Sequence, residues 1–360
     1  MTKENQPKRH HYVPQGYLRG FADQKEHIQV VPLDPSENTR RPHVKNVALF
    51  NNFHTTPEVP DDPVWFEKEL SQVEGKAVDV IRRIEGGKFP LRPQDRADMA
   101  LFIALQAVRG PDTRNNTDEM LRNILRIEIG LGGRENIGRW IERKVGRTPT
   151  PELEDALWRE VNDPHGLQFK RPNYMHIFHA VELAEHLWPY IYLRSWQVVR
   201  FERRSLLTCD APVSLVPRND HEPWRGVGFE NAQAVAFPLT RKIGLLMMEA
   251  LPHLDHIPLL RGLQTDEERL EWLRSQVSSG CMDHEIPGTT ALANLFNAQA
   301  VGGALRYVYH HPDDGLIVPD DLPEPRLITV EMSPYPGGPF GEEPPFGYWA
   351  HEGSGEASET

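Results

Sequence analysis

Cysteine is nearly absent from this chain: its 360 residues include two, Cys209 and Cys281. Two thiols cannot form a disulfide framework, so the sequence favours a cytoplasmic protein over a secreted one. Long hydrophobic runs are absent too, because the stretch 243–248 is far shorter than the roughly 20 residues needed to cross a bilayer. The first residues are polar and basic and lack the apolar segment of a signal peptide. We therefore expect no membrane partner.

Two catalytic signatures and an excess of basic charge are also missing. There is no Gly-x-Ser-x-Gly elbow, which argues against a serine hydrolase of that type, and no glycine-rich phosphate loop, which argues against a nucleotide-driven motor. The formal net charge is −12, whereas sequence-independent adhesion to nucleic acid relies on many Lys and Arg contacts to phosphate. The net charge therefore disfavours broad coating of nucleic acid, but it does not exclude binding at a local basic patch.

The order of the apolar patterns predicts an α+β protein, in which mostly helical N-terminal two-thirds pack with a small antiparallel sheet and C-terminal helices. A short edge strand over 27–33 comes first. Capping residues and breakers then predict helices over 64–85, 93–109, 116–129, 134–145, 151–161 and 173–188, strands over 195–201, 205–208, 234–239 and 243–248, and final helices over 265–278 and 289–302. The first two of these strands are expected to pair as a hairpin.

The composition predicts one domain over residues 8–332, with a helical part at about 60–190 and a sheet-containing part at about 191–332. The chain is 39% hydrophobic, which is enough for a sizeable core. Residues 333–360 are rich in Gly, Pro, Glu and Ser and cannot bury enough apolar surface to offset the ordering of the chain. The sequence predicts a mobile tail there.

Two motifs, far apart in the chain, carry a family resemblance. Residues 10–21 read HHYVPQGYLRGF, and residues 208–212 read TCDAP. Together they resemble the bacterial domain of unknown function 4238, whose members open with a His-Tyr-Val-Pro…Tyr-Leu-Arg-x-Phe signature and carry a later Thr/Ser-x-Asp-x-Pro element. The resemblance spans about residues 8–310. It implies a shared fold and no established activity.

His11 lies among aromatic and aliphatic residues, and Pro14 fixes the backbone behind it, so its ring should be held in place. Such a ring suits catalysis or ligand binding. Alternatively, the aromatic residues anchor the N-terminus and the histidine only completes a hydrogen bond there. The resemblance favours function for the matching polar positions, with His11 as an acid/base and Tyr12 and Tyr17 binding substrate. His10 has no such support.

Glu67 and Glu74 are seven residues apart on the first long predicted helix, which is two turns, so both project from one face. Two such carboxylates could bind a divalent metal, Mg or Mn, or share a proton. A solvated glutamate face is the common alternative. The segment resembles the acidic helix of the family, which makes Glu67 and Glu74 the candidate metal ligands on this helix.

Gln106 and Arg109 are the polar residues of an otherwise apolar stretch of the next predicted helix, and they lie three residues apart. Unpaired polar groups in a core cost about 1–3 kcal/mol or more, so both need partners. One interpretation is an internal salt bridge from Arg109 to Glu74 or Glu67. The other is that Arg109 binds an anionic substrate group, with Gln106 beside it. The family carries the same Gln-x-x-Arg pair.

Asp210 follows a predicted strand, and Pro212 fixes the chain after it. A carboxylate at a strand end is a common place for a metal ligand or a general base, and Thr208 could orient it. An Asx-turn is the alternative. Asn294 and Asn297 lie three residues apart in the last predicted helix, and the resemblance implies that they line the same pocket, with Asn297 binding substrate. Hydrogen bonds along the helix face are the alternative.

These positions point to one buried polar site. We expect a metal-assisted hydrolase acting on a phosphate-containing substrate, a nucleotide or nucleic acid. The competing hypothesis is a non-catalytic ligand-sensing or protein-binding module in which the same residues form a structural network. In the enzyme hypothesis the catalytic residues are His11, Glu74 and Asp210, the metal ligands are Glu67, Glu74 and Asp210, and the substrate-binding residues are Tyr12, Tyr17, Gln106, Arg109, Thr208 and Asn297. His11, Glu74, Arg109 and Asp210 should then converge in one pocket.

Overall fold

The computed structural model describes residues 9–56, 62–163, 171–219, 226–249 and 265–326. It is a mixed α+β protein, as the sequence predicts. The described residues divide into two compact units, where the sequence predicts one domain over 8–332. Unit 1 holds those up to 111 and from 173 onward, and unit 2 holds those between 112 and 172. The predicted tail, 333–360, lies outside the described residues.

Unit 1 is organised around a five-stranded sheet in the order β6-β7-β8-β4-β9. Neighbouring strands are antiparallel, except that β4 and β9 run parallel. The central strands read as continuous apolar runs because they are covered on both faces. The strand bounds are Ser195–Arg200 for β4, Ser214–Val216 for β6, Ala234–Thr240 for β7, Ile243–Met248 for β8 and His284–Pro287 for β9.

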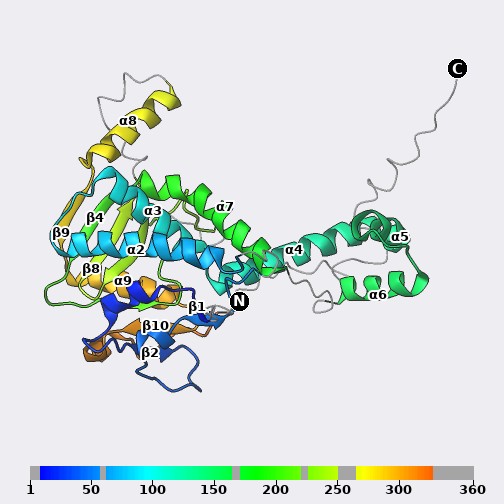
Figure 1. Ribbon diagram of the computed structural model, residues 1–360, viewed down its shortest axis with the longest axis horizontal. Helices are drawn as coiled ribbons and strands as arrows, with labels where there is room; N and C mark the ends of the chain where they lie inside the picture. The colour runs from blue at the N-terminus through cyan, green and yellow to red at the C-terminus, as the bar shows by residue number, and fades with distance from the viewer. Residues whose placement is uncertain (1–8, 57–61, 164–170, 220–225, 250–264, 327–360) are drawn as a thin grey trace, which may run out of the picture. The chain divides into compact units, whose positions relative to one another are not determined.

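Three long helices pack side by side on this sheet, with α3 between α2 and α7 (Figure 1). Their bounds are Trp65–Glu85 for α2, Pro93–Val108 for α3 and Asn173–Tyr192 for α7. The predicted starts and ends of α2 and α3 agree with these bounds to within a residue or two. In α2 the buried positions recur every three or four residues, so one stripe of the helix faces the core.

The helix α9 (Thr290–Gly303) covers the opposite face of the sheet. Phe102 of α3 makes an edge-to-face contact with Phe237 of β7, with ring centroids 6.1 Å apart. Gly244 of β8 meets α9 instead, because a Cβ there would come within 2.5 Å of the Phe296 ring. Phe237 pairs with the residue after Gly244, and adjacent strand residues point to opposite faces. The sheet is therefore the middle layer of three.

A second, three-stranded sheet in the order β2-β10-β5 joins the two ends of unit 1. Its strands are Gln29–Pro32 (β2), Tyr307–His310 (β10) and Thr208–Cys209 (β5). The predicted strand at 27–33 is confirmed as an edge strand. The N-terminal motif forms β1 (Arg9–His11), paired with β3 (Leu49–Asn51), then α1 (Gln15–Leu18) and a 3-10 turn at Arg19–Phe21.

The predicted hairpin of 195–201 with 205–208 is wrong. β5 pairs with β10, while β4 pairs with β8 and β9. The turn between β7 and β8 binds the chain that connects β4 to β5. The main-chain N–H groups of Phe201 and Leu206 donate to the carbonyls of Lys242 and Arg241, respectively. Six residue pairs along β8 also offer β4 a longer partner than the two residues of β5.

Unit 2 is a small helical body. Its hydrophobic core contains the buried side chains of Ile129, Ile137, Ile141 and Val161. The single helix predicted over 134–145 is broken into a 3-10 turn, one α-helical turn and a π-helical turn that ends at Gly146, whose φ is +68°. The bounds are Pro111–Gly132 for α4, Arg134–Asn136 for the 3-10 turn, Ile137–Trp140 for α5, Ile141–Val145 for the π turn and Pro151–Asn162 for α6.

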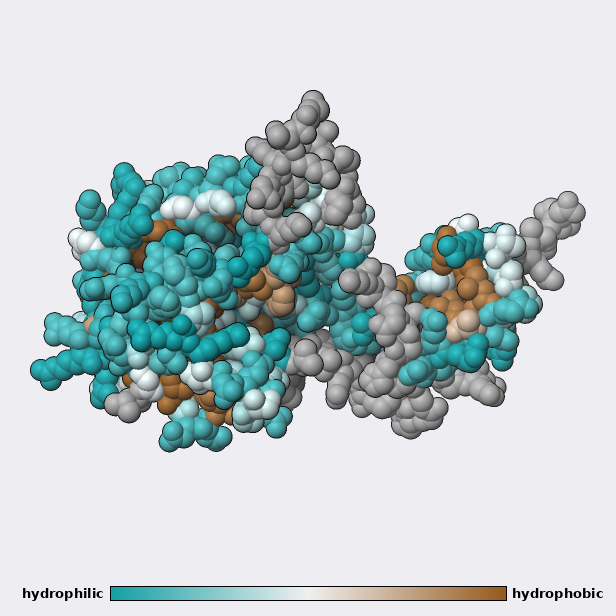
Figure 2. Space-filling view, turned by 60° about the horizontal axis from the view of Figure 1, so that its bottom comes forward, coloured by the Kyte–Doolittle hydropathy of each residue, from teal (hydrophilic) through white to brown (hydrophobic). Residues whose placement is uncertain are grey.

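The remaining elements of unit 1 are short or peripheral. α8 spans Asp266–Ser279 and begins with the predicted capping box, in which Thr265 and Glu268 exchange hydrogen bonds. Two further 3-10 turns lie at Val44–Asn46 and Pro312–Ile317. None of the described helices combines the length and the apolar character needed to span a membrane. The face shown in Figure 2 is mostly hydrophilic, with hydrophobic side chains in separate areas.

Candidate functional site

The N-terminal motif is anchored in the core by its apolar side chains. Val13 and Phe21 are fully buried. Tyr12 donates its main-chain N–H to the carbonyl of Ala48 over 2.9 Å and stacks on a neighbouring aromatic ring. The backbone is thus fixed on both sides of His11, through the β1–β3 pairing before it and these contacts after it. The sequence predicted such an anchored histidine.

Arg109 lies at the C-terminal end of α3, and its side chain is 2% exposed. Its Nε donates to the main-chain carbonyl of Tyr12 (3.0 Å), one terminal nitrogen donates to Oε1 of Glu74 (2.7 Å), and the other donates to Oε1 of Gln106 (2.8 Å). Gln106 donates its own Nε2 to the same Tyr12 carbonyl (3.1 Å). The internal salt bridge to Glu74 is therefore present. A substrate anion would have to compete with Glu74 for this guanidinium.

The two glutamates of α2 face different partners. Glu74 binds Arg109, and burial raises the pKa of Glu74 although the guanidinium opposes that rise. Glu67 lies 2.7 Å from Nδ1 of His54 through its Oε2. Burial works to raise the pKa of Glu67 as well, but the hydrogen bond and charge of His54, with smaller contributions from His10 and Arg109, outweigh it and lower that pKa. Glu67 is thus ionised at neutral pH.

His11 is held as a neutral ring. Burial lowers its pKa, and the charges of Arg9 and Arg109 add to this, while Glu67 and a hydrogen bond to the main chain of Lys45 work against it. Nε2 of His11 is enclosed and has no hydrogen-bond partner among the described residues. Nδ1 is therefore the nitrogen that donates to the Lys45 carbonyl, and Nε2 carries the lone pair.

Two histidines that sequence reasoning did not select complete this region. His10 and His54 are 0% and 1% exposed, and their donor atoms and those of Glu67 all lie within 4.8 Å of one another. His54 follows β3 in a loop without a motif, and the sequence offers no support for a role of His10. The signal that could have found them is the pairing of β1 with β3, which sequence does not reveal. We call His10, His11, His54 and Glu67 the N-terminal site.

Asp210 has a different environment from the one predicted for a metal ligand or base. Its Oδ1 accepts the main-chain N–H of Leu305 (2.8 Å), and its Oδ2 accepts those of Arg306 (2.8 Å) and Tyr307 (3.1 Å). Burial raises the pKa of Asp210 to about 6, although these N–H groups act to lower it. Both oxygens thus hold the chain that enters β10.

Thr208 and Tyr17 form a buried pair beneath the sheet. Oγ1 of Thr208 lies 2.7 Å from the Tyr17 hydroxyl, which also lies 2.7 Å from the carbonyl of Pro238. Burial raises the pKa of Tyr17 well above its ordinary value. These bonds join α1 to β5 and β7, so both side chains already have partners within the fold.

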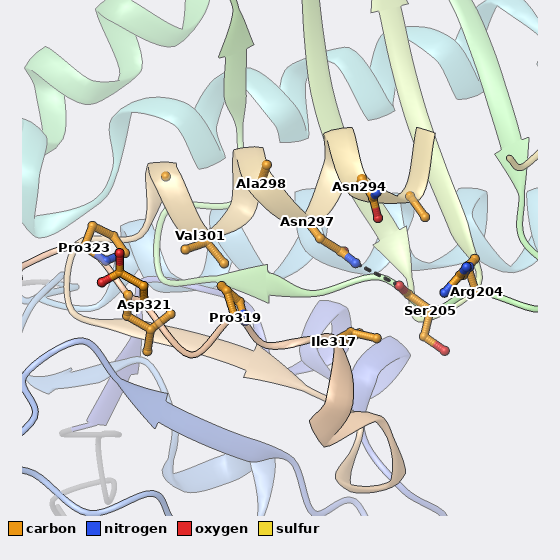
Figure 3. A pocket seen from close by; sticks show the side chains of 13 residues that line it. Arg204, Ser205, Asn294, Asn297, Ala298, Val301, Ile317, Pro319, Asp321 and Pro323 are labelled. Atoms are coloured by element: carbon orange, nitrogen blue, oxygen red, sulfur yellow. Dashed lines mark hydrogen bonds between the residues drawn. The ribbon is translucent and has the colours of Figure 1, made fainter. Parts of the chain in front are cut away.

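Asn297 and Asn294 line one pocket of about 690 Å³ (Figure 3). Asn297 accepts the main-chain N–H of Leu207 (2.8 Å) and donates to the carbonyl of Ser205 (3.1 Å). The pocket lies between α9 and the chain around Pro319, and none of the residues of the N-terminal site lines it.

The predicted residues therefore fall into two regions. Glu74, Gln106 and Arg109 share one hydrogen-bond network with the Tyr12 carbonyl, and the charges of Glu67 and Arg109 act on His11. The other predicted residues, Tyr17, Thr208, Asp210 and Asn297, are bonded to the second sheet, β7 and the chain beside α9.

Residues 9–314 match the family described as "Protein of unknown function (DUF4238)". The chain belongs to the DUF4238 family. No curated protein and no solved structure matches this DUF4238 chain. The predicted resemblance is thus confirmed, and the matched range includes both motifs and every residue of the N-terminal site.

Proposed function

We propose that this DUF4238 protein is a metal-assisted hydrolase of a phosphate-containing substrate, a nucleotide or nucleic acid, and that it acts at the N-terminal site. The observation that carries the proposal is His11. Its Nε2 is enclosed, has no hydrogen-bond partner among the described residues, and belongs to a ring whose pKa is lowered by burial. A neutral imidazole with an unused lone pair is suited to accept a proton from an attacking water.

The surroundings of His11 suit an anionic substrate. Arg9 is exposed, lies close enough to lower the pKa of His11, and donates to the side-chain oxygen of Asn46 over 3.0 Å. A guanidinium has five N–H groups, so this single bond leaves others for phosphate oxygens. Arg9 therefore replaces Arg109 as the anion-binding arginine in this proposal, since the guanidinium of Arg109 is buried against Glu74.

The other predicted polar residues form hydrogen bonds within the fold and are given no part in the reaction. Gln106 and Arg109 both donate to the Tyr12 carbonyl, one residue after His11, and Glu74 accepts from Arg109, so the network holds the strand that carries the histidine. Asp210 is assigned no catalytic role, because its two oxygens accept three main-chain N–H groups. A divalent ion, where bound, would supply a more acidic water.

A non-catalytic module remains the second candidate, and the closed network of Arg109 favours it. Three of the four groups predicted to converge, Glu74, Arg109 and Asp210, are satisfied by bonds within the fold. A purely structural network needs no further ligand. In that case His11 is the one predicted catalytic residue whose buried nitrogen still has to be explained.

The experiment that separates the two candidates measures hydrolysis of phosphomonoesters, phosphodiesters, nucleotides and oligonucleotides by the full chain. His11→Gln should lower kcat by about 10²–10⁴-fold, the usual contribution of a general base, while leaving the melting temperature near that of the wild type. His186→Gln, at an exposed histidine on α7, is the matched control and should change neither. Hydrolysis that survives in His11→Gln, or its absence from every substrate class, would overturn the proposal.

The pH dependence has a definite sign. Because burial lowers the pKa of His11 below 6.5, the ring should become a competent base at a pH below that value. Activity should rise through this pKa and be level at neutral pH. This rise of activity with pH should be missing from the residual activity of His11→Gln.

A further inference from the structure

The buried cluster of His10, His54 and Glu67 has no assigned chemistry. Pairing of β1 with β3 sets His10 opposite Phe50, next to the turn that carries His54. Glu67 enters from the first turn of α2. One nitrogen from each imidazole and one carboxylate oxygen lie within 4.8 Å of one another, and no second group of three His, Cys, Asp or Glu side chains at this spacing occurs in the described ranges.

The contacts inside the cluster fix the orientation of each ring. Nδ1 of His54 lies 2.7 Å from Oε2 of Glu67, and the main-chain N–H of His54 donates to Nδ1 of His10 over 2.7 Å. The two rings are stacked, with centroids 5.6 Å apart and planes 11° apart. Phe66 packs edge-on against His54. Rings held in this way lose little freedom when they bind a ligand.

We propose that His10, His54 and Glu67 bind one divalent transition-metal ion of the zinc class. The donor set is two imidazole nitrogens and one carboxylate, which is the three-ligand set of catalytic zinc sites with a fourth position left to water. Imidazole suits Zn, Fe, Ni and Cu, whereas Mg prefers an all-oxygen octahedral shell. The site thus differs in ligands and metal from the predicted Mg or Mn site at Glu67, Glu74 and Asp210.

Burial and charge are compatible with a cation at this position. Glu67 is 24% exposed, which leaves an approach from solvent, while both histidines are covered. Glu67 supplies the carboxylate oxygen of the cluster, a ligand that favours a cation. Arg109 contributes the opposing positive charge, but its guanidinium is paired with Glu74.

Ion binding requires one rearrangement that can be observed. The main-chain N–H of His54 donates to Nδ1 of His10 over 2.7 Å. An ion bound at Nδ1 would take the lone pair that this N–H uses, and an ion bound at Nε2 would move the ring proton to Nδ1, so either mode ends the bond from the His54 amide. On His54, binding through Nδ1 moves the ring proton to Nε2. The amide resonance of His54 should therefore shift on ion binding.

This inference deepens the proposed function, because the ion would assist the same hydrolysis, but it is tested by binding alone. The full chain, freed of metal with a chelator, is titrated with ZnCl₂ by calorimetry and with Co(II) by visible absorption. One equivalent per chain should bind, and Co(II) should give the intense absorption of a four-coordinate site. Glu67→Gln should weaken binding at least about tenfold. Glu69→Gln, at an exposed glutamate two residues away on α2, should bind as the wild type does.

Three results would overturn the inference: no stoichiometric ion, equal affinity in Glu67→Gln and the wild type, or loss of binding in Cys281→Ser, which removes the exposed thiol. Because substitution of a buried histidine could unfold the chain, the partly exposed Glu67 carries the decision, and the His54 amide shift provides a second measurement on the wild type. Ion binding without hydrolysis would leave this inference intact and overturn the proposed function. Metal-dependent hydrolysis that requires His11 but is unchanged in Glu67→Gln would do the reverse.

Discussion

Replacement of Arg109 by methionine tests the core of the polar network. The guanidinium is 2% exposed and makes three hydrogen bonds, to the Tyr12 carbonyl, Glu74 and Gln106. Methionine keeps the apolar stem of the side chain and removes the guanidinium with its charge, which leaves the buried Glu74 carboxylate without its cation. Breaking a buried ion pair in this way costs about 3–5 kcal/mol of unfolding free energy.

The loss should depend on pH in a direction set by Glu74. Burial already raises the pKa of Glu74 in the folded chain, and Arg109 opposes that rise, so the variant should have a still higher folded pKa. A carboxyl group whose folded pKa lies above its unfolded value favours folding when protonated, and that contribution is lost as pH rises through the folded pKa. The deficit of Arg109→Met should therefore be largest at pH 7 and shrink as pH falls toward 4.5, the ordinary pKa of Glu74.

Urea unfolding followed by circular dichroism at pH 5 and pH 7 measures both effects. The double variant Arg109→Met with Glu74→Gln should recover part of the loss, since no buried charge then stays unpaired. Arg82→Met, at an arginine of α2 whose side chain is 70% exposed, is the control and should cost less than about 1 kcal/mol. A loss below about 1 kcal/mol for Arg109→Met, or strict additivity with Glu74→Gln, would refute the reasoning.

Two further variants test the role of Asp210 beside the second sheet and the packing of helices on both faces of the five-stranded sheet. Asp210→Asn should cost about 1–3 kcal/mol, because its amide NH₂ would face main-chain N–H donors. Since burial raises the pKa of Asp210 to about 6 in the folded chain, the wild type should lose stability as pH rises through that value, and the variant should lack this dependence in urea melts at pH 5 and 7. Gly244→Ala places a Cβ within 2.5 Å of the Phe296 ring and should cost about 1–3 kcal/mol of unfolding free energy. The control Gly302→Ala meets open space on α9 and should not lower the melting temperature. Equal melting temperatures for the two variants would contradict the placement of α9 on the sheet.

The helices and the polar pairs within them could be predicted because their signals are local. Proline, glycine and the apolar period bound α2 and α3 almost to the residue. The sequence predicts partners for Gln106 and Arg109 because a buried polar residue needs one, and Glu74 is one of the two glutamates that it offers to Arg109. Whether that pair also binds substrate did not follow from the pattern. In the structure the Arg109 side chain is 2% exposed, and three of its five N–H groups donate to Tyr12, Glu74 and Gln106.

The cluster of His10, His54 and Glu67 could not be predicted because it depends on contacts between distant segments. His54 and Glu67 are 13 residues apart, and His10 precedes His54 by 44. Three-residue strands such as β1 and β3 carry too short an alternation to reveal their pairing. The same limit explains the wrong hairpin: proximity in sequence suggested that β5 pairs with β4, and the partner it has, β10, lies about 100 residues later.

The most direct test of metal-assisted hydrolysis at the N-terminal site combines a hydrolysis assay with removal and return of the metal. Phosphodiester hydrolysis is measured for the wild type, Glu67→Gln and Glu69→Gln after chelator treatment and again after one equivalent of Zn(II) is added back. The proposed zinc site at His10, His54 and Glu67 predicts that chelation abolishes activity in the wild type and in Glu69→Gln and that Zn(II) restores it in both, while Glu67→Gln stays inactive. Activity that is indifferent to chelation, or equal recovery in Glu67→Gln, would contradict it.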